Sequence, residues 1–231
     1  MLGQQEPDPV SPFWTDPETV ESFANRDPDR RLVQLLDSYT EPQKVPVLDL
    51  GCAGGRNTVL LASRGFDFQA VDGSWPMMEK TRESIGAICG AAAAQERVRA
   101  GVMEDLSEFS DGSFHLIVAL GIYHQASSLD HWHECVAESA RVLHEGGLVL
   151  ISAFTPDSQP AGKPLQPVQG MADMYGGFSS GPLCLFKMDE HDEAMASHGF
   201  EPHVPTETVS VKTELGFRLT MNALYRKHGP T

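Results

Sequence analysis

The residues with the clearest chemical potential stand in VLDLGCAGGRNT, residues 47–58. An apolar run carries a carboxylate, Asp49, and passes into a turn that holds Gly51, Gly54 and Gly55. Glycines let the backbone approach a ligand closely, and a helix that follows such a turn presents unpaired N–H groups. The pattern therefore predicts a ligand-binding turn between a strand and a helix.

Two classes of ligand compete for this turn. The pyrophosphate of a dinucleotide needs the pattern G-x-G-x-x-G, which would place glycine where this chain has Ala53 and Arg56. The Asp49 carboxylate would also repel a pyrophosphate, whereas it can pair with the ammonium of an amino-acid moiety, directly or through water. The turn thus favours S-adenosylmethionine, which carries no phosphate, over a nicotinamide dinucleotide.

A second acid, Asp72, ends the run FQAVD and stands 17 positions after Gly55. This spacing fits one helix and one strand, so the Asp72 carboxylate can accept hydrogen bonds from both ribose hydroxyls of a nucleoside. Dehydrogenases carry an acid at this place too. Together with the missing dinucleotide pattern, it favours an adenosyl sulfonium.

Apolar runs alternate with helical patterns along the chain, which predicts a mostly parallel sheet with helices on both faces. Ligands of such sheets bind outside the carboxyl ends of the strands. The expected strands lie near 45–50, 67–71, 97–102, 114–120 and 147–153, followed by a helix near 188–198 and a closing antiparallel hairpin formed by the runs 202–210 and 214–226. Nearer the front, Asp27-Pro28 predicts a helix start, with Leu32, Leu35 and Leu36 at helical spacing.

Composition narrows the classes of partner. The chain has 231 residues, 17 Lys and Arg, 32 Asp and Glu, and a formal net charge of -15. A nucleic-acid partner is disfavoured because binding to the phosphate backbone depends on Lys and Arg. The four cysteines are widely spaced, which indicates reduced thiols. The chain shows neither a signal-peptide pattern nor an apolar run that could span a bilayer, so we expect a cytoplasmic location.

The chain resembles a known family, the class I S-adenosylmethionine-dependent methyltransferases. The resemblance rests on four ordered stretches: VLDLGCAGGRN, AVDGSWPMMEK, GVMEDLSEFSDGSFHLIVAL and ARVLHEGGLVLIS. FKMDEHDEAMASHGFE is similar to the helix before the family's terminal hairpin. Gly-Arg-Asn at 55–57 is most similar to the tellurite-resistance and small-molecule (ubiquinone-type, thiopurine-like) branches.

The resemblance implies a fold and a division of the chain. The fold is a Rossmann-like, doubly wound α/β sheet of seven strands, mostly parallel with the last strand antiparallel. We expect one methyltransferase domain over 1–231, with an N-terminal flap at 1–27, a cofactor-binding core at 28–153, a lid-like insertion at 154–187, and a terminal helix and β-hairpin at 188–231.

The resemblance also implies roles for single residues. The methionine moiety is assigned to the first turn and the residues beside it, Asp49, Gly51, Cys52, Ala53, Gly55 and Asn57. Asp72 matches the acid that binds the ribose, and Gly73 and Met77 flank it. Where many relatives have Asp-Ala beside the adenine, this chain has Val102 and Met103. The adenine amine is therefore left to Glu104 or Asp105, or to no side chain, while Met103 supplies its backbone N–H and apolar cover.

The acceptor end of the site is expected after the fourth strand. There Leu120 borders the methionine end, and Tyr123 and His124 are the candidate catalytic side chains. His124 has an ordinary pKa near working pH and suits a general base, with a structural loop histidine as the alternative. A metal site is not expected at His131 and His133, because helix neighbours two apart point in different directions.

Two further segments carry expectations. In the helix after the fourth strand, Leu129, Trp132, Val136 and Leu143 form the expected buried stripe, and Ser127 with Asp130 resembles a capping box. Residues 155–183 mix Pro, Gly and Ser with Met and aromatic residues, which is typical of a functional lid; a disordered or partner-facing loop is the alternative.

The sequence thus predicts methyl transfer from S-adenosylmethionine to a small-molecule O, S or N nucleophile by in-line displacement. A cofactor-binding sensor or pseudoenzyme is the first alternative, and a nicotinamide oxidoreductase the second. Methylation of protein or nucleic acid has little support, because the acidic balance repels phosphates. The sequence leaves the acceptor and the oligomeric state open.

Overall fold

The structure, a computed structural model, describes residues 11–229. The chain divides into two compact units between Val102 and Met103, and each is described by itself. The expected flap at 1–27 lies partly outside the described residues. None of the helices within residues 11–229 has the length and apolarity that a bilayer-crossing segment needs.

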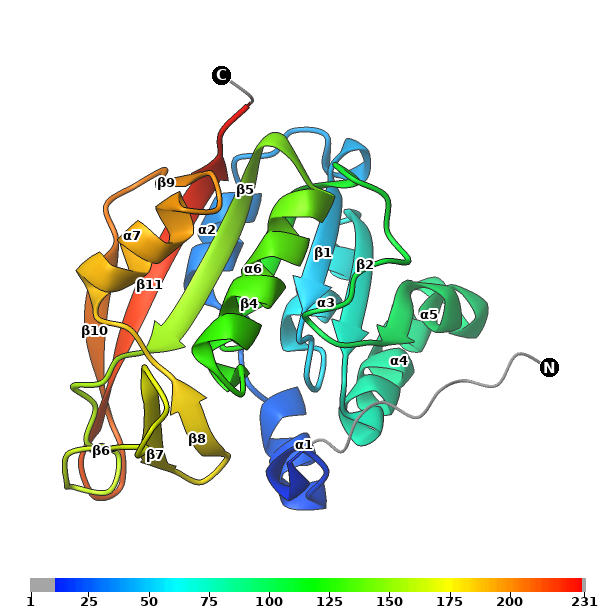
Figure 1. The fold of residues 1–231 in the computed structure, drawn as a ribbon. Helices are drawn as coiled ribbons and strands as arrows, with labels where there is room; N and C mark the ends of the chain where they lie inside the picture. The colour runs from blue at the N-terminus through cyan, green and yellow to red at the C-terminus, as the bar shows by residue number, and fades with distance from the viewer. Residues whose placement is uncertain (1–10, 230–231) are drawn as a thin grey trace. The chain divides into compact units, whose positions relative to one another are not determined.

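The first unit holds three parallel strands in the order β1-β2-β3. Its elements are η1 (Pro12–Trp14), α1 (Pro17–Ala24), α2 (Arg30–Leu36), η2 (Pro42–Lys44), β1 (Pro46–Leu50), α3 (Arg56–Ser63), β2 (Asp67–Asp72), α4 (Trp75–Cys89), α5 (Ala91–Arg97) and β3 (Val98–Ala100). β1 and β2 lie side by side in Figure 1, and both α3 and α4 pack on β2. β1 is buried from Val47 to Leu50, as is usual for a strand of a parallel sheet, and it carries Asp49 among its apolar residues.

Helix α2 begins later than the sequence predicts. Its N-cap is Asp29, whose carboxylate accepts a hydrogen bond from the Arg31 backbone N–H at 2.9 Å. The predicted start at Asp27-Pro28 is therefore wrong by about one half-turn, since the cap belongs to the acid after the proline. The expected core residues Leu32 and Leu36 are buried.

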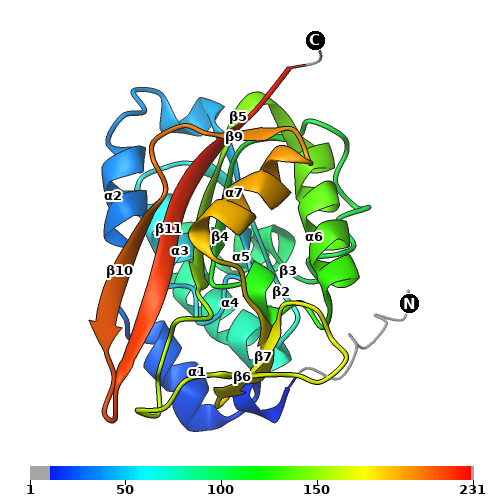
Figure 2. The ribbon, with the colours of Figure 1, turned by 60° about the vertical axis from the view of Figure 1, so that its left-hand side comes forward.

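The second unit holds the remaining strands, with β4 and β5 parallel and β11 antiparallel to β5. Its elements are β4 (Phe114–Leu120), η3 (Tyr123–Gln125), α6 (Leu129–Val142), β5 (Leu143–Phe154), β6 (Gln166–Pro167), β7 (Met174–Phe178), β8 (Gly181–Cys184), α7 (Met188–Ala196), β9 (Phe200–Pro202), β10 (Glu207–Lys212) and β11 (Phe217–Lys227). β10 and β11 form the long hairpin of Figure 2. A mixed α/β fold, mostly parallel with an antiparallel final strand, is thereby confirmed.

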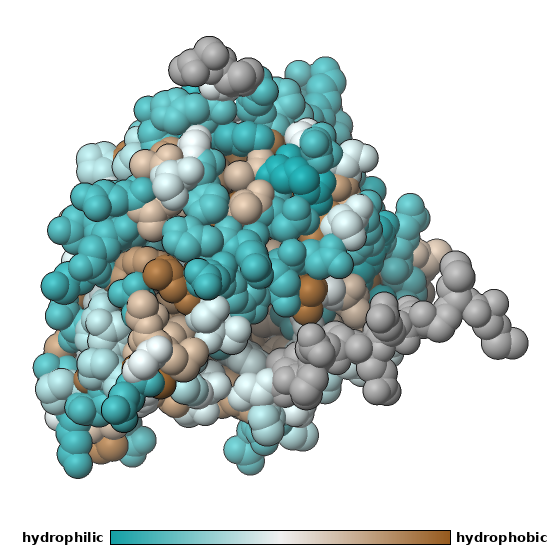
Figure 3. All heavy atoms as spheres, in the orientation of Figure 1, coloured by the Kyte–Doolittle hydropathy of each residue, from teal (hydrophilic) through white to brown (hydrophobic). Residues whose placement is uncertain are grey.

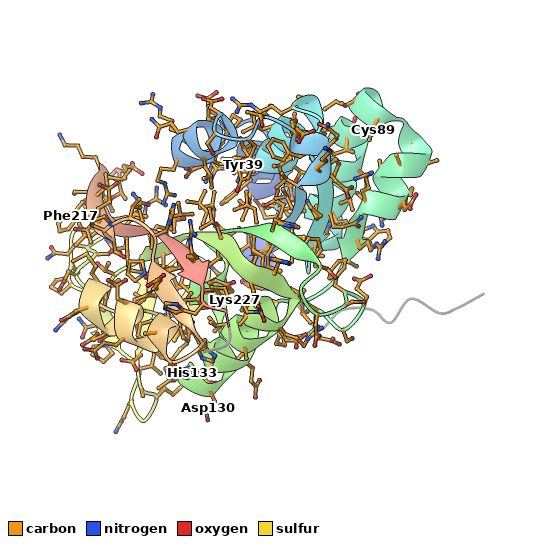
Figure 4. All side chains as sticks on the ribbon, turned by 90° about the horizontal axis from the view of Figure 1, so that it is seen from above. Tyr39, Cys89, Asp130, His133, Phe217 and Lys227 are labelled. Atoms are coloured by element: carbon orange, nitrogen blue, oxygen red, sulfur yellow. The ribbon has the colours of Figure 1, made fainter. Side chains whose placement is uncertain are left out.

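The junction between α6 and β5 differs from the sequence prediction. β5 begins at Leu143, directly after α6, so Leu143 is buried as a strand residue and is not part of the helix stripe. Lys227, labelled in Figure 4, secures this junction by donating hydrogen bonds to the carbonyls of Ala140 and Leu143 at 2.6 and 2.7 Å. The helix is capped by Ser128, whose hydroxyl accepts from the His131 backbone N–H, and the predicted cap at Ser127 is wrong by one residue.

The insertion at 154–187 contains a small antiparallel sheet, β6-β7-β8, that the sequence analysis did not predict. Leu165, Leu183 and Leu185 form its apolar cluster, against which Phe154 and Phe178 pack. This segment is therefore a folded subdomain.

The face of the molecule shown in Figure 3 is mostly hydrophilic, in keeping with the strongly acidic composition.

Candidate functional site

The glycine turn between β1 and α3 adopts the left-handed backbone conformation at three positions. Gly51, Ala53 and Gly55 have φ of 72°, 48° and 87°. A residue other than glycine is uncommon there, so Ala53 is held in place by its surroundings. The N–H groups of Gly51 and Cys52 both donate to the Val71 carbonyl, at 2.8 and 3.1 Å. The turn is thereby fixed to β2.

Asp72, at the end of β2, joins this turn to the start of the next helix. One carboxylate oxygen accepts from the Ala53 N–H at 2.7 Å, and the other accepts from the Ser74 N–H at 2.8 Å. Burial raises the pKa of Asp72 to about 6, although the two N–H groups oppose this shift. A carboxylate has about four acceptor sites, so two remain for hydroxyl donors.

Asp49 is almost fully buried and is held by a residue that the sequence analysis did not name. Its carboxylate accepts from the Thr58 hydroxyl at 2.6 Å. Burial raises the pKa of Asp49 to about 6, and the positive charge of Arg56 acts in the opposite direction. Thr58 lies in the first turn of α3, so its place after the glycines was the available signal.

Thr81 is a second residue that the sequence analysis missed. From the buried face of α4 its hydroxyl donates to the Ala53 carbonyl at 2.7 Å, and the Cys52 thiol lies 3.9 Å from the same hydroxyl. Burial raises the pKa of Cys52 well above its usual range, so the thiol stays protonated. Cys52 and Thr81 therefore stabilise the conformation of the turn by contacts inside the protein.

The N-terminal segment packs directly on the glycine turn. A Cβ built on Gly54 would lie 2.5 Å from the Ala24 backbone nitrogen, so only glycine fits there. The Ser74 hydroxyl donates to the Trp14 carbonyl at 2.6 Å. Asn57, predicted as a cofactor contact, accepts from the Asp29 N–H at 3.1 Å and so also has a structural use.

The remaining predicted residues of the first unit lie around Asp72. Gly73 separates it from Ser74 and is partly exposed, while Met77 is buried in the first turn of α4. The structure therefore brings Asp49, the turn and Asp72 together within one unit. Their contacts are set by the backbone conformation of the turn.

Met103, Glu104 and Asp105, predicted beside the adenine, lie in the second unit and differ in their surroundings. Met103 is buried. Asp105 is exposed and accepts from the Ser107 N–H at 3.0 Å, and Ser107 lowers the pKa of that carboxyl. The Glu104 carboxylate lies 3.2 Å from Nε2 of His131. Glu104 thus lies beside a histidine ring, while Asp105 closes a local turn.

Glu104, His131 and Cys135 offer ligand atoms within 4.8 Å of one another. The Ser127 N–H donates to Nδ1 of His131 at 3.0 Å, so the neutral ring carries its proton on Nε2, the nitrogen that faces Glu104. That nitrogen cannot then bind a cation. Burial also raises the pKa of Cys135. Nε2 of His131 is buried without a hydrogen-bond partner among the described residues, so it and the Glu104 carboxylate are close neighbours and do not form a hydrogen bond.

His131 and His133 have separate partners. His133, labelled in Figure 4 on α6 with Asp130, places Nδ1 2.9 Å from Nε2 of His198. His131 contacts Ser127 and Glu104 instead. The two rings therefore do not share a ligand, which is the geometry that their spacing predicts.

Leu120 ends β4, and the candidate catalytic residues Tyr123 and His124 follow in η3. The Tyr123 hydroxyl is buried and donates to the Ser139 hydroxyl at 2.8 Å, and burial raises its pKa. The His124 ring stacks on Phe154 with centroids 4.7 Å apart. Both side chains are thus engaged within the protein.

The hydrogen bond of His124 determines which nitrogen carries its proton. Nδ1 accepts from the Phe154 N–H at 3.3 Å, so Nε2 carries the proton in the neutral ring. Burial, and then the charge of Arg218, lower the pKa of His124 to about 4. A general-base role, still a prediction, would need this Nδ1 contact to open.

Comparisons with known proteins agree with this architecture. Residues 47–147 match the family model described as a methyltransferase domain. A stretch of 120 residues is 29% identical to a protein of Encephalitozoon cuniculi that is named as an inferred methyltransferase. The match covers 51% of this chain and 49% of the relative, so it spans about half the length of that protein.

Two solved structures illustrate the range of proteins with this fold. The 1,6-didemethyltoxoflavin-N1-methyltransferase of Burkholderia thailandensis, solved with 1,6-didemethyltoxoflavin and S-adenosylhomocysteine, is 21% identical, with a TM-score of 0.63 over 94% of this chain and 81% of the other. The [4+2]-cyclase SpnF is 15% identical, with a TM-score of 0.69 over 98% and 100%. At these identities the likeness shows the fold, which is the Rossmann-like fold found in methyltransferases.

Proposed function

We propose that this chain transfers a methyl group from S-adenosylmethionine to a small-molecule O, S or N nucleophile. The observation that carries the proposal is the position of Asp72. Its carboxylate accepts hydrogen bonds from the Ala53 N–H of the glycine turn and from the Ser74 N–H after β2, and it keeps two acceptor sites. The match of residues 47–147 to a methyltransferase domain supports it.

The residues fit the cofactor by their chemistry. Asp72 accepts hydrogen bonds from the ribose hydroxyls, and the Gly51–Gly55 backbone holds the methionine moiety. The negative charge of Asp49, near the end of β1, stabilises the ammonium of that moiety. Glu104 accepts a hydrogen bond from the adenine amine in preference to Asp105, because Asp105 is exposed and already accepts from the Ser107 N–H. Met103 supplies apolar cover. When bound, the cofactor provides a methyl group already activated by the sulfonium.

The work left to the protein is mostly positioning. In-line displacement needs the nucleophile about 3 to 3.5 Å from the methyl carbon, in a site from which water is excluded. A base is needed only when the nucleophile carries a proton at working pH. His124 and Tyr123 remain the proposed acceptor-side residues, and the protonated Nε2 of His124 suits it to donate a hydrogen bond to the acceptor. The resemblance of residues 55–57 to small-molecule branches of the methyltransferases, and the 1,6-didemethyltoxoflavin bound by one fold neighbour, favour a small acceptor.

Calorimetry with S-adenosylhomocysteine tests the cofactor assignment. Wild type should bind with micromolar-scale affinity, and Asp72→Ala should lose most of it. Asp67→Ala is the matched control, because Asp67 begins the same strand and its exposed carboxylate pairs with Arg97. Equal affinity in Asp72→Ala and wild type would remove the ribose assignment. A screen of thiols, phenols, amines and metalloid anions for demethylated cofactor then identifies the acceptor class.

A second function, cofactor binding without methyl transfer, is favoured by a specific observation. The Tyr123 hydroxyl and Nδ1 of His124 are both occupied by internal hydrogen bonds, and a cyclase shares the fold. Tight binding of S-adenosylmethionine with no turnover across the screen would support this second function over the first.

A further inference from the structure

Arg218, the second residue of β11, is an arginine without a charged partner. It is partly buried, its Nε is buried without a hydrogen-bond partner, and among residues 11–229 it makes no ion pair. Arg141, by contrast, pairs with both Glu138 and Asp111.

The unpaired Nε–H of Arg218 carries a cost that the contact of the guanidinium with the Phe154 ring offsets only in part. Leaving a buried donor without an acceptor costs on the order of 1–3 kcal/mol, and more when the group is charged. Native structures satisfy almost all of these groups, and an exception in a folded protein often indicates a missing ligand. Among the described atoms of this kind Arg218 Nε is the one that belongs to a cation, so its surroundings decide whether it marks a site for an anion.

The surroundings of Arg218 are aromatic. Its guanidinium carbon lies 5.3 Å from the centroid of the Phe154 ring. The His124 ring is stacked on Phe154 at 4.7 Å, and the Phe178 ring is stacked on it at 5.0 Å with an interplanar angle of 5°. Phe154 and Phe178 are both partly exposed, so this stack has an accessible surface.

The position in the fold is one where ligands bind. Phe154 is the last residue of β5, and His124 follows the end of the parallel strand β4. Ligands of parallel sheets bind outside these carboxyl ends. β11 runs antiparallel to β5 with Thr220 opposite Phe154, which brings Arg218 to the same end. Phe217, labelled in Figure 4, marks this start of β11.

We infer that Arg218 and the His124–Phe154–Phe178 stack recognise a planar methyl acceptor that carries a carboxylate. The rings take the plane of the acceptor, and the guanidinium takes the carboxylate in a two-point contact, for which its geometry is suited. This inference rests on the proposed function, because it names the class of acceptor. It makes Arg218 a residue that determines specificity, with no part in the transfer itself.

Paired probes that differ only in charge test the inference. Calorimetry compares benzoate, 4-hydroxybenzoate and indole-3-acetate with their neutral carboxamides, with and without saturating S-adenosylhomocysteine. Wild type should bind at least one acid about tenfold or more tightly than its amide. Arg218→Gln should remove this preference. Arg226→Gln, an exposed arginine of the same strand, should retain it. No acid preference in wild type, or an equal preference in Arg218→Gln, overturns the inference.

Two measurements distinguish recognition of an anion by Arg218 from a purely structural role of its side chain. Arg218→Met keeps the stem and removes the charge, so its denaturation midpoint should equal or exceed that of wild type; a clear drop would make Arg218 a structural residue and overturn the inference. Affinity for S-adenosylhomocysteine should be unchanged in Arg218→Gln. Failure of wild type to bind that cofactor product would refute the proposed function, while the acid preference would still be measurable.

Discussion

At the scale of single residues, two acids dominate the first unit, the buried Asp49 and the half-buried Asp72. Asp49 and Asp72 both have a pKa raised to about 6 by burial, and each is held by a named donor. Their places could be predicted from sequence, because each ends a strand or nearly does. Their partners could not, since the bonds to Thr58 and Ala53 depend on how the turn folds.

The raised pKa of Asp72 predicts a pH-dependent cofactor affinity. Above pH about 6 the carboxylate is ionised and accepts the ribose hydroxyls strongly; below it the group is protonated and loses acceptor strength. Affinity for S-adenosylhomocysteine should be level above pH about 7 and fall below about 6, by up to about tenfold per pH unit. In Asp72→Asn only the contribution of Asp49 should remain, so calorimetry should give a shallower profile. Identical profiles would refute the assignment.

The contact between Glu104 and His131 predicts which acid reads the adenine. Glu104→Gln should lower the preference for S-adenosylhomocysteine over its inosine analogue, which has a carbonyl in place of the amine. The expected reduction is about tenfold, the size of one charge-assisted hydrogen bond. His131→Phe should lower the same preference less than Glu104→Gln does, because His131 is only a neighbour of the Glu104 carboxylate, 3.2 Å away. Asp105→Asn serves as the control, because Asp105 is engaged with Ser107. A larger effect at Asp105 would reverse the assignment.

At the scale of elements, the turn between β1 and α3 depends on close packing as well as on backbone freedom. Gly55 has φ of +87°, and a Cβ there would lie 2.8 Å from the Thr81 hydroxyl and 3.1 Å from its Cα. Gly65, after α3, has φ of +76° with nothing within 4 Å. The two glycines share a backbone conformation and differ only in their neighbours.

This pair separates the two costs of an added methyl group. Gly65→Ala should lower the free energy of unfolding by about 1–2 kcal/mol, the cost of a left-handed residue. Gly55→Ala should lower it by a further ~1–3 kcal/mol, because the overlap with α4 includes backbone. Denaturant unfolding measures both. Equal losses would mean that the packing of α4 on the turn adjusts freely.

Strands whose pattern is local were predicted well, and elements that depend on distant partners were not. The run 114–120 is β4 as expected, because a short run that is apolar at every position except His115 is a clear strand signal. The sheet β6-β7-β8 was missed because its strands contain Gly and Pro and are set by mutual pairing and by the Leu165 cluster. Helix starts at Asp29 and Ser128 were misplaced because neighbouring residues offered equally good caps.

At the scale of the whole molecule, buried titratable groups have opposing effects on acid stability. Burial lowers the pKa of His124 to about 4 and of His191 to about 3. Unfolded histidine takes up protons below pH about 6.5, so each buried histidine makes stability fall as pH decreases through this window. Asp49 and Asp72 act in the opposite sense between pH about 6 and 4, because the folded state then binds more protons than the unfolded state.

Replacing one histidine should change the pH dependence of the free energy of unfolding. Over pH 6 to 4 each group changes the free energy of unfolding by about 1.4 kcal/mol per pH unit, so two histidines and two acids nearly cancel. His191, whose Nδ1 lies 2.8 Å from the Tyr225 hydroxyl, is the histidine to replace. In His191→Gln the pH slope should differ from wild type by about 1.4 kcal/mol per unit, with the free energy of unfolding rising toward acid relative to wild type, whatever the variant's stability at neutral pH. His228→Gln, at an exposed histidine, should keep the wild-type slope. Urea unfolding at half-unit steps measures the difference, and parallel curves for His191→Gln and wild type would show that His191 is not held neutral by burial.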